Sequence, residues 1–186
     1  MSRKNFGAKP LCYPQPVFII GTYDENGNPN AMNAAWGGIS GENEISLCLS
    51  PEHKTCRNFA KTGAFTVSMA DAKHVAGCDY VGIASGNKVP DKFEKAGFTA
   101  IKSENVNAPI INELAVCIEC RVISFDEDSC ILRGEIVNVS VDESVLTDGK
   151  VDVSKVQPLC FDPFNRAYHV MGEKIGEAWN SGKHLL

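Results

Sequence analysis

The pattern of apolar and polar positions along the chain predicts a protein built mainly from β-strands. Residues 16–23 form a continuous apolar run, typical of a strand buried on both faces, and the Asn26-Gly27 pair that follows favours a hairpin turn. The return strand is expected over residues 29–37. Alternating or long apolar runs predict further strands over residues 44–50, 65–69, 114–125 and 130–141.

Four helices are expected between or after these strands. One spans residues 53–61, between a Ser-Pro pair and Gly63, a residue typical of helix C-termini. Asp71 caps a second helix that runs to about residue 81, and Pro90 begins a short third helix that ends at Gly97. The last covers residues 173–179. Many short strands joined by hairpins, with few helices, favour an antiparallel barrel with helical decoration.

Length, composition and charge restrict the classes of function. The 186 residues suit one domain over residues 1–186, and the proportions of apolar and charged residues (44% and 22%) argue against disorder. A net charge of −5 without a basic cluster argues against a nucleic-acid partner. No apolar stretch approaches the length of a transmembrane span and residues 1–9 are polar, so we expect no membrane partner and a cytoplasmic location.

Four short stretches of the chain share their order and spacing with a known family. They are Gly21-Thr22-Tyr23 with residues 29–36 (PNAMNAAW), residues 49–58 (LSPEHKTCRN), Ala84-Ser85-Gly86 with Asp91-Lys92-Phe93, and residues 168–172 (YHVMG) with Lys174-Ile175-Gly176. On these stretches the chain resembles the flavin reductase-like family, and the flavoredoxin branch is the closer likeness. Each stretch is short, but together they cover nearly the whole chain.

The resemblance implies a fold, a cofactor and a partner. The fold is mainly β with helical decoration, an antiparallel Greek-key split β-barrel of the FMN-binding type. The family likeness further implies a homodimer with FMN at or near the subunit interface, and transfer of electrons or hydride through the flavin ring. The redox partner is then either another protein or a nicotinamide nucleotide, NADH or NADPH.

A phosphate site is expected where the first helix begins. Free backbone N–H groups at a helix N-terminus favour an anion, and the segment from Ser50 to Asn58 adds side-chain donors from His53, Lys54, Thr55 and Arg57. From the residues alone, an ordinary helix start with solvated basic side chains is the favoured explanation of this segment. With the family resemblance, we interpret it as the site of the FMN phosphate.

The flavin ring is expected beside Asn33, Ala34, Ala35 and Trp36. Small side chains let a flat ring approach the strand backbone, whose polar groups would then tune the electronics of the cofactor. The alternatives are that the two alanines pack closely inside a barrel and that Trp36 fills the core, where aromatic residues are common.

A second contact region is expected at Ser85, Gly86 and Lys92. A loop of small residues passes close to a ligand easily, and Lys92 would place a positive charge near the ring or the phosphate. The alternatives are a surface turn and a solvated lysine. The spacing between Ser85 and Lys92 is one residue longer than is usual in the family.

The eight cysteines offer a rival constellation. Cys117 and Cys120, with His53 and Cys56, have the residue types of a tetrahedral zinc site. Residues three apart in a strand point to opposite faces, so Cys117 and Cys120 are interpreted as structural, reduced thiols and no metal site is expected. For His169, a structural role or a contact across the dimer is favoured.

Several functions stay open at this level. In one version FMN remains bound and relays electrons between proteins, and in another NADH or NADPH reduces a flavin that is then released. A binding module of the same fold, holding flavin or haem without turnover, is the alternative from another class, with His53 or His169 as haem ligand. A zinc-dependent structural protein is the weaker third.

Overall fold

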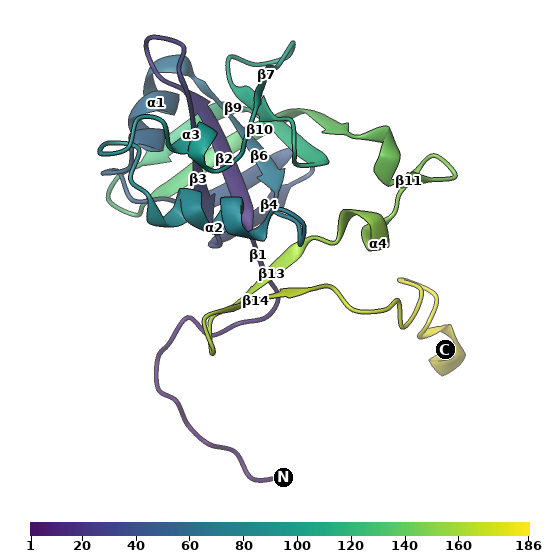
Figure 1. The fold of residues 1–186 in the computed structure, drawn as a ribbon. Coiled ribbons are helices and arrows are strands. Elements are labelled where there is room, and N and C mark those ends of the chain that lie inside the picture. Colours follow the sequence, from purple (N-terminus) through teal and green to yellow (C-terminus); the bar gives the residue numbers. More distant parts are fainter.

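A computed structural model describes residues 1–186 and shows a mostly β protein around one curled sheet (Figure 1). The sheet has seven strands in the order β3-β2-β6-β9-β10-β5-β4, and every neighbouring pair is antiparallel. Its strands are β2 (Phe18–Tyr23), β3 (Pro29–Ala34), β4 (Gly37–Gly41), β5 (Glu44–Cys48), β6 (Ala64–Met69), β9 (Val116–Asp126) and β10 (Ile131–Val141). The predicted antiparallel, helix-decorated β fold is confirmed.

The concave side of this sheet holds the main core. Ile45, Leu47 and Leu49 are buried there, as the alternation along residues 44–50 predicts. Phe59, from the first helix, packs edge-on against Phe125 at a ring-centroid distance of 5.2 Å. A continuous apolar interior therefore fixes the curvature of the sheet and the position of this helix against it.

Helix α1 (Lys54–Thr62) packs in the core on the concave side of the sheet, whereas α2 (Val75–Ile83) and α3 (Lys92–Lys95) pack on the opposite face, in a second apolar cluster with Val17 and Ile19. All three helices contact β3 (Figure 1). Gly63 ends α1 in the left-handed conformation (φ +68°), as predicted. Helix α2 begins four residues after Asp71, because the Asp71 carboxylate accepts from the backbone N–H and ring of His74 and forms a turn first. The longest helices have nine residues, about half of what a membrane span requires.

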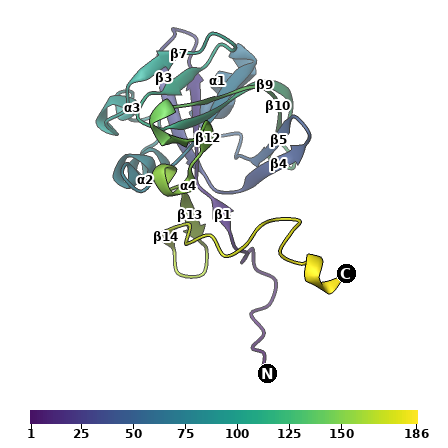
Figure 2. The same ribbon diagram turned by 90° about the vertical axis from the view of Figure 1, so that its right-hand side faces the viewer.

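Smaller elements complete the molecule. Strand β1 (Gln15–Pro16) joins β13 (Leu159–Asp162) and β14 (Ala167–Val170) in a separate three-stranded sheet, drawn below the body in both views (Figure 1 and Figure 2). The others are β7 (Ala100–Lys102) with β8 (Pro109–Ile111), β11 (Leu146–Thr147) with β12 (Lys150–Val151), α4 (Val153–Val156), and the 3₁₀ turns η1 (Glu143–Val145) and η2 (Lys183–Leu185).

Two element predictions are wrong. No helix forms over residues 173–179: the chain is irregular there and then turns, with Ile175 and Trp179 exposed. A short helix without an apolar surface to pack on is marginal in water, which accounts for the difference. The strand expected over residues 29–37 ends at Ala34, and β4 starts at Gly37 and pairs with β5 instead.

Candidate functional site

An apolar cavity of about 410 Å³ opens between the end of β3 and the last turn of α2. Its walls come from four parts of the fold: the β3–β4 connection, the end of β5, helix α2 and the β13–β14 hairpin. The lining residues are Met32, Asn33, Ala34, Ala35, Trp36, Cys48, Leu49, His53, Asp79, Gly82, Ile83, Phe161 and Tyr168. Mostly hydrophobic lining with a few polar groups is typical of a site for a flat organic ligand.

A second, more polar cavity of about 430 Å³ adjoins the first. It lies between the start of α1 and the segment that leaves α2. The lining residues are Asn30, Met32, Asn33, His53, Lys54, Thr55, Val81, Gly82, Ile83, Ala84, Ser85, Gly86 and Lys92. Five of these also line the first cavity, so the two form one continuous site with an apolar part and a polar part.

The start of α1 gives the polar cavity unpaired donors. The backbone N–H groups of Lys54 and Thr55 have no acceptor in the chain, and no acidic side chain occupies the first turn. The Lys54 ammonium is held 3.2 Å from Asp24, whose pKa is lowered to about 2: burial opposes the charge, but bonds from Asn28 and Lys54 outweigh it. This end of the helix therefore presents N–H groups and positive charge to an anion.

Lys92 supplies a second cation from α3. Its side chain is 4% exposed, and its ammonium donates to the carbonyl oxygens of Val81 (3.1 Å) and Ala84 (2.9 Å) at the C-terminal end of α2. Burial, followed by the charge of Lys54, lowers the pKa of Lys92 to about 8. A buried ammonium bonded only to neutral carbonyls remains available to a negative ligand.

Asn30 provides an unpaired polar atom in the same cavity. It is 2% exposed, and its amide nitrogen donates to the Thr55 hydroxyl at 2.9 Å, while its Oδ1 has no hydrogen-bond partner. A Cβ placed on Gly86 would collide with that oxygen, so the loop backbone approaches Asn30 as closely as only glycine permits. Buried amides are normally satisfied, which makes this group a candidate ligand contact.

Hydrogen bonds hold the end of α2 against the cavity. The Asn33 amide donates to the Cys78 carbonyl at 3.0 Å, and the Tyr168 hydroxyl donates to Asp79 at 2.8 Å. Burial and that bond to Asp79 raise the pKa of Tyr168 to about 12, so its hydroxyl stays protonated. Gly82 lets the helix close on β3, because an added Cβ would lie only 2.9 Å from the Cβ of Asn33.

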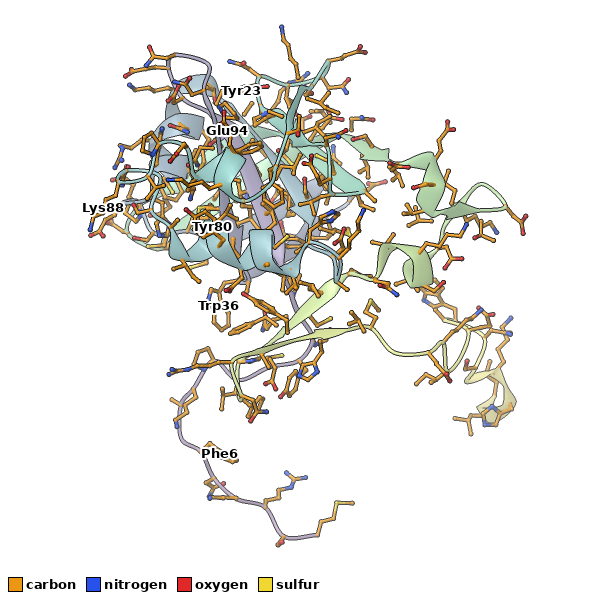
Figure 3. The ribbon with its side chains drawn as sticks, in the orientation of Figure 1. Phe6, Tyr23, Trp36, Tyr80, Lys88 and Glu94 are labelled. Atoms are coloured by element: carbon orange, nitrogen blue, oxygen red, sulfur yellow. The ribbon has the colours of Figure 1, made fainter.

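Trp36 lies at the mouth of the apolar cavity and not in the core. It is 40% exposed and meets Phe161 edge-on at 6.5 Å between ring centroids. Figure 3 shows it on the side of the body that faces the β13–β14 hairpin. The prediction that left core filling and ligand contact open for Trp36 is therefore resolved in favour of a cavity position.

Ten of the twelve residues predicted to bind the cofactor line one or both cavities. These are Asn33, Ala34, Ala35, Trp36, His53, Lys54, Thr55, Ser85, Gly86 and Lys92. Ser50 and Asn58 do not: the Ser50 carbonyl accepts from His53 N–H before the helix, and the Asn58 amide donates to the buried Thr22 hydroxyl at 3.0 Å. Burial, followed by the charge of Lys92, lowers the pKa of His53.

Other lining residues were not predicted as site residues, among them Asn30, Met32, Cys48, Asp79, Phe161 and Tyr168. Asn30 and Met32 belong to the same stretch as Asn33, so their sequence position was a usable signal. Asp79 reaches the cavity because α2 packs on β3, and Phe161 because the β13–β14 hairpin meets Trp36, and no local pattern reveals either contact.

The cysteines are all free thiols. Cys117 and Cys120 lie three residues apart on β9, where they pair with Ser68 and Phe65 of β6. Cys120 belongs to the core cluster on the concave side and Cys117 does not, so the two side chains point to opposite faces of the sheet. Burial raises the pKa of both to about 12. His169 is exposed, outside both cavities, with its ring 3.6 Å from Asp162.

Comparisons with known proteins agree with this geometry. The family described as flavin reductase like domain matches residues 11–169. The flavoredoxin of Desulfovibrio vulgaris (Miyazaki F) is 40% identical, with 98% of this chain and all of that one covered and a TM-score of 0.93. The flavoredoxin of Methanosarcina acetivorans is 27% identical over 100% and 99% of the two chains, with a TM-score of 0.86. A protein of Aeropyrum pernix is 25% identical over a match that covers 67% of this chain and 49% of that protein. This chain therefore spans about half the length of that relative.

Proposed function

This chain belongs to the flavin reductase-like family, and we propose that it binds FMN non-covalently and transfers electrons through it. The observation that carries this proposal is the junction of the two cavities, one apolar and one rich in donors. FMN joins a flat, largely apolar ring to a phosphate dianion through a short polyol. A ligand of that kind needs both environments at neighbouring positions.

The polar cavity fits the phosphate. Lys54 and Thr55 would donate backbone N–H groups, and the Thr55 hydroxyl and Lys92 ammonium would add side-chain donors. The unpaired Oδ1 of Asn30 would accept from a polyol hydroxyl. These donors supply the local positive field that a chain of net charge −5 needs to hold an anion.

The apolar cavity fits the ring. Strand β3 is an edge of the seven-stranded sheet, so alternate backbone N–H and C=O groups point away from β2 and toward the cavity side. Ala34 and Ala35 keep this backbone accessible, while Trp36 and Phe161 cover the opening. The electron chemistry would be supplied by the flavin ring when bound, and the chain's part is to orient it and exclude water.

We further propose that FMN is retained as a prosthetic group and that the protein is an electron carrier of the flavoredoxin type. Similarity to two flavoredoxins over the full length of each chain supports this version over a reductase that releases its flavin. The proposed assembly is a homodimer with FMN near the subunit interface. The half-exposed Trp36 and exposed Ile83 at the cavity mouth are the kind of surface that a second subunit covers.

The test reconstitutes flavin-free protein with FMN and removes excess by gel filtration. We expect one FMN per chain to co-elute, to bleach anaerobically with dithionite, and to recover its colour with an oxidised acceptor. Loss of FMN on the column together with rapid NADH or NADPH oxidation in the presence of free FMN would favour the reductase. Protein that retains no flavin and consumes no nicotinamide would contradict both.

A further inference from the structure

The last sixteen residues, 171–186, form an arm that is fully exposed and has no hydrogen bond to the rest of its own subunit. Every residue of this C-terminal arm is exposed, and it carries Met171, Ile175, Trp179, Leu185 and Leu186. All hydrogen bonds of the arm join residues within the arm, such as Ser181 with Glu177. Figure 1 and Figure 2 both show it leaving β14 and running away from the sheet. Large apolar side chains arranged in this way call for a partner surface.

The arm is also part of the similarity to a known structure. The match to the flavoredoxin of Desulfovibrio vulgaris covers 98% of this chain and all of that one, so it extends into the C-terminal arm. Terminal segments are usually poorly ordered unless they are held by a contact. A contact with a second chain would give an arm that is present in both proteins such a role.

The mouth of the apolar cavity offers a matching surface. Ile83 is 75% exposed and Trp36 is 40% exposed, and both line that cavity. The arm begins three residues after Tyr168, which lines the same cavity, so it leaves the body beside the surface in question. In a two-fold symmetric pair, an arm that departs next to a patch meets the equivalent patch of the other subunit.

We propose that the C-terminal arm of each subunit lies across a second copy of this chain and closes the mouth of its apolar cavity, with Trp179 and Ile175 packed on Trp36 and Ile83. The arm is long enough: sixteen extended residues span up to about 50 Å, more than the diameter of a subunit of this size. It contains two acidic and two basic residues, so it is not repelled by a copy of net charge −5. The lack of a basic excess argues against a membrane surface as its partner.

The consequence for function rests on the proposed binding of FMN. With the arm in place, the ring cavity of one subunit is closed by residues of the other, so retention of FMN depends on the dimer. A carrier that keeps its cofactor needs such a closure, whereas an enzyme that releases reduced flavin does not. The arm is therefore a structural basis for the carrier version of the function.

Tryptophan fluorescence of the flavin-free protein tests the contact directly, because the chain has only two tryptophans. In Trp36→Phe, Trp179 is the sole reporter. We expect a blue-shifted, shielded emission at concentrations where sedimentation shows a dimer, and a shift to water-exposed emission on dilution to the monomer. Adding Ile83→Glu should expose Trp179, because it places a charge in the cavity mouth, whereas Ile101→Glu, a change at an exposed isoleucine of β7, should not.

A shortened chain, residues 1–172, gives the second readout. We expect it to dimerise more weakly than the full chain and, once loaded, to lose FMN roughly tenfold faster or more, since interface changes act mainly on dissociation. Phe6→Ala, in the N-terminal segment, is the matched control and should change neither. Water-exposed Trp179 at every concentration, with unchanged mass and FMN release in the shortened chain, would overturn the proposal. Shielded Trp179 in a protein that binds no FMN would support the arm contact and contradict the proposed function instead.

Discussion

The buried ammonium of Lys92 makes FMN affinity depend on pH in a way that the structure specifies. In the free protein its pKa is about 8, against a usual value of 10.5, because burial and then Lys54 disfavour the charge. At 1.36 kcal/mol per pKa unit, this difference corresponds to about 3 kcal/mol that the fold sets against the charged form. A phosphate dianion beside Lys92 offsets that cost, so the pKa of Lys92 rises when FMN binds.

The sign of the effect follows from the protons bound. Below pH 8, Lys92 is already charged in the free protein, and binding requires no proton uptake by this group. Above pH 8, binding takes up a proton, so affinity falls with rising pH, approaching tenfold per pH unit. The phosphate, with a second pKa near 6, stays a dianion throughout this range.

Titration calorimetry at pH 7, 8, 9 and 9.5 measures this dependence. We expect Lys92→Met to bind FMN about 1.5–3 kcal/mol more weakly at pH 7, the usual worth of a hydrogen bond to a charged group, and to show no further loss above pH 8. Lys95→Met, on the same helix but with an exposed ammonium paired to Asp91, is the control and should keep the wild-type affinity and slope. Equal slopes above pH 8 in wild type and Lys92→Met would refute the reasoning.

Three further changes probe the site and the core. Thr55→Val removes the hydroxyl proposed to donate to the phosphate, so FMN should bind about 1–3 kcal/mol more weakly in equilibrium dialysis while riboflavin, which lacks the phosphate, loses less; equal losses for both would place the phosphate elsewhere. Gly86→Ala pushes a methyl group against Asn30 and should weaken FMN binding in the same assay, whereas Gly38→Ala, in open space, should be neutral. Phe59→Ala should lower the free energy of unfolding by about 3–5 kcal/mol in urea, and a loss below about 1 kcal/mol would contradict its core role.

The parts of the fold that the sequence predicts are those where a local pattern and tertiary burial agree. Residues 44–50 alternate because one face of β5 lies in the core, and α1 begins and ends where its flanking Ser-Pro pair and Gly63 place it. Strand β4 was missed because its Gly37-Gly38 start has little side-chain pattern and its pairing with β5 defines it. The segment 173–179 has helical spacing of apolar residues but no surface in its own subunit on which to pack.

The residues of the candidate site also differ in whether a local sequence pattern or only tertiary packing brings them to the cavity. Asn33 to Trp36 and His53 to Thr55 could be predicted because they lie in contiguous motifs at a strand end and a helix start. Asn58 does not line the cavity because it lies one turn into α1, where its amide donates to Thr22. Asp79 and Phe161 could not be found from local patterns, since only the packing of α2 and the β13–β14 hairpin brings them to the cavity.

The most direct test of the central claim is calorimetric titration of the flavin-free protein with FMN and, separately, with riboflavin. The two ligands share the ring and polyol and differ only in the phosphate. The account predicts one FMN site per chain and an affinity for FMN at least about a hundredfold above that for riboflavin, because two or more charge-assisted bonds are lost with the phosphate. Equal affinity for the two ligands, or no heat of binding with either, would contradict it.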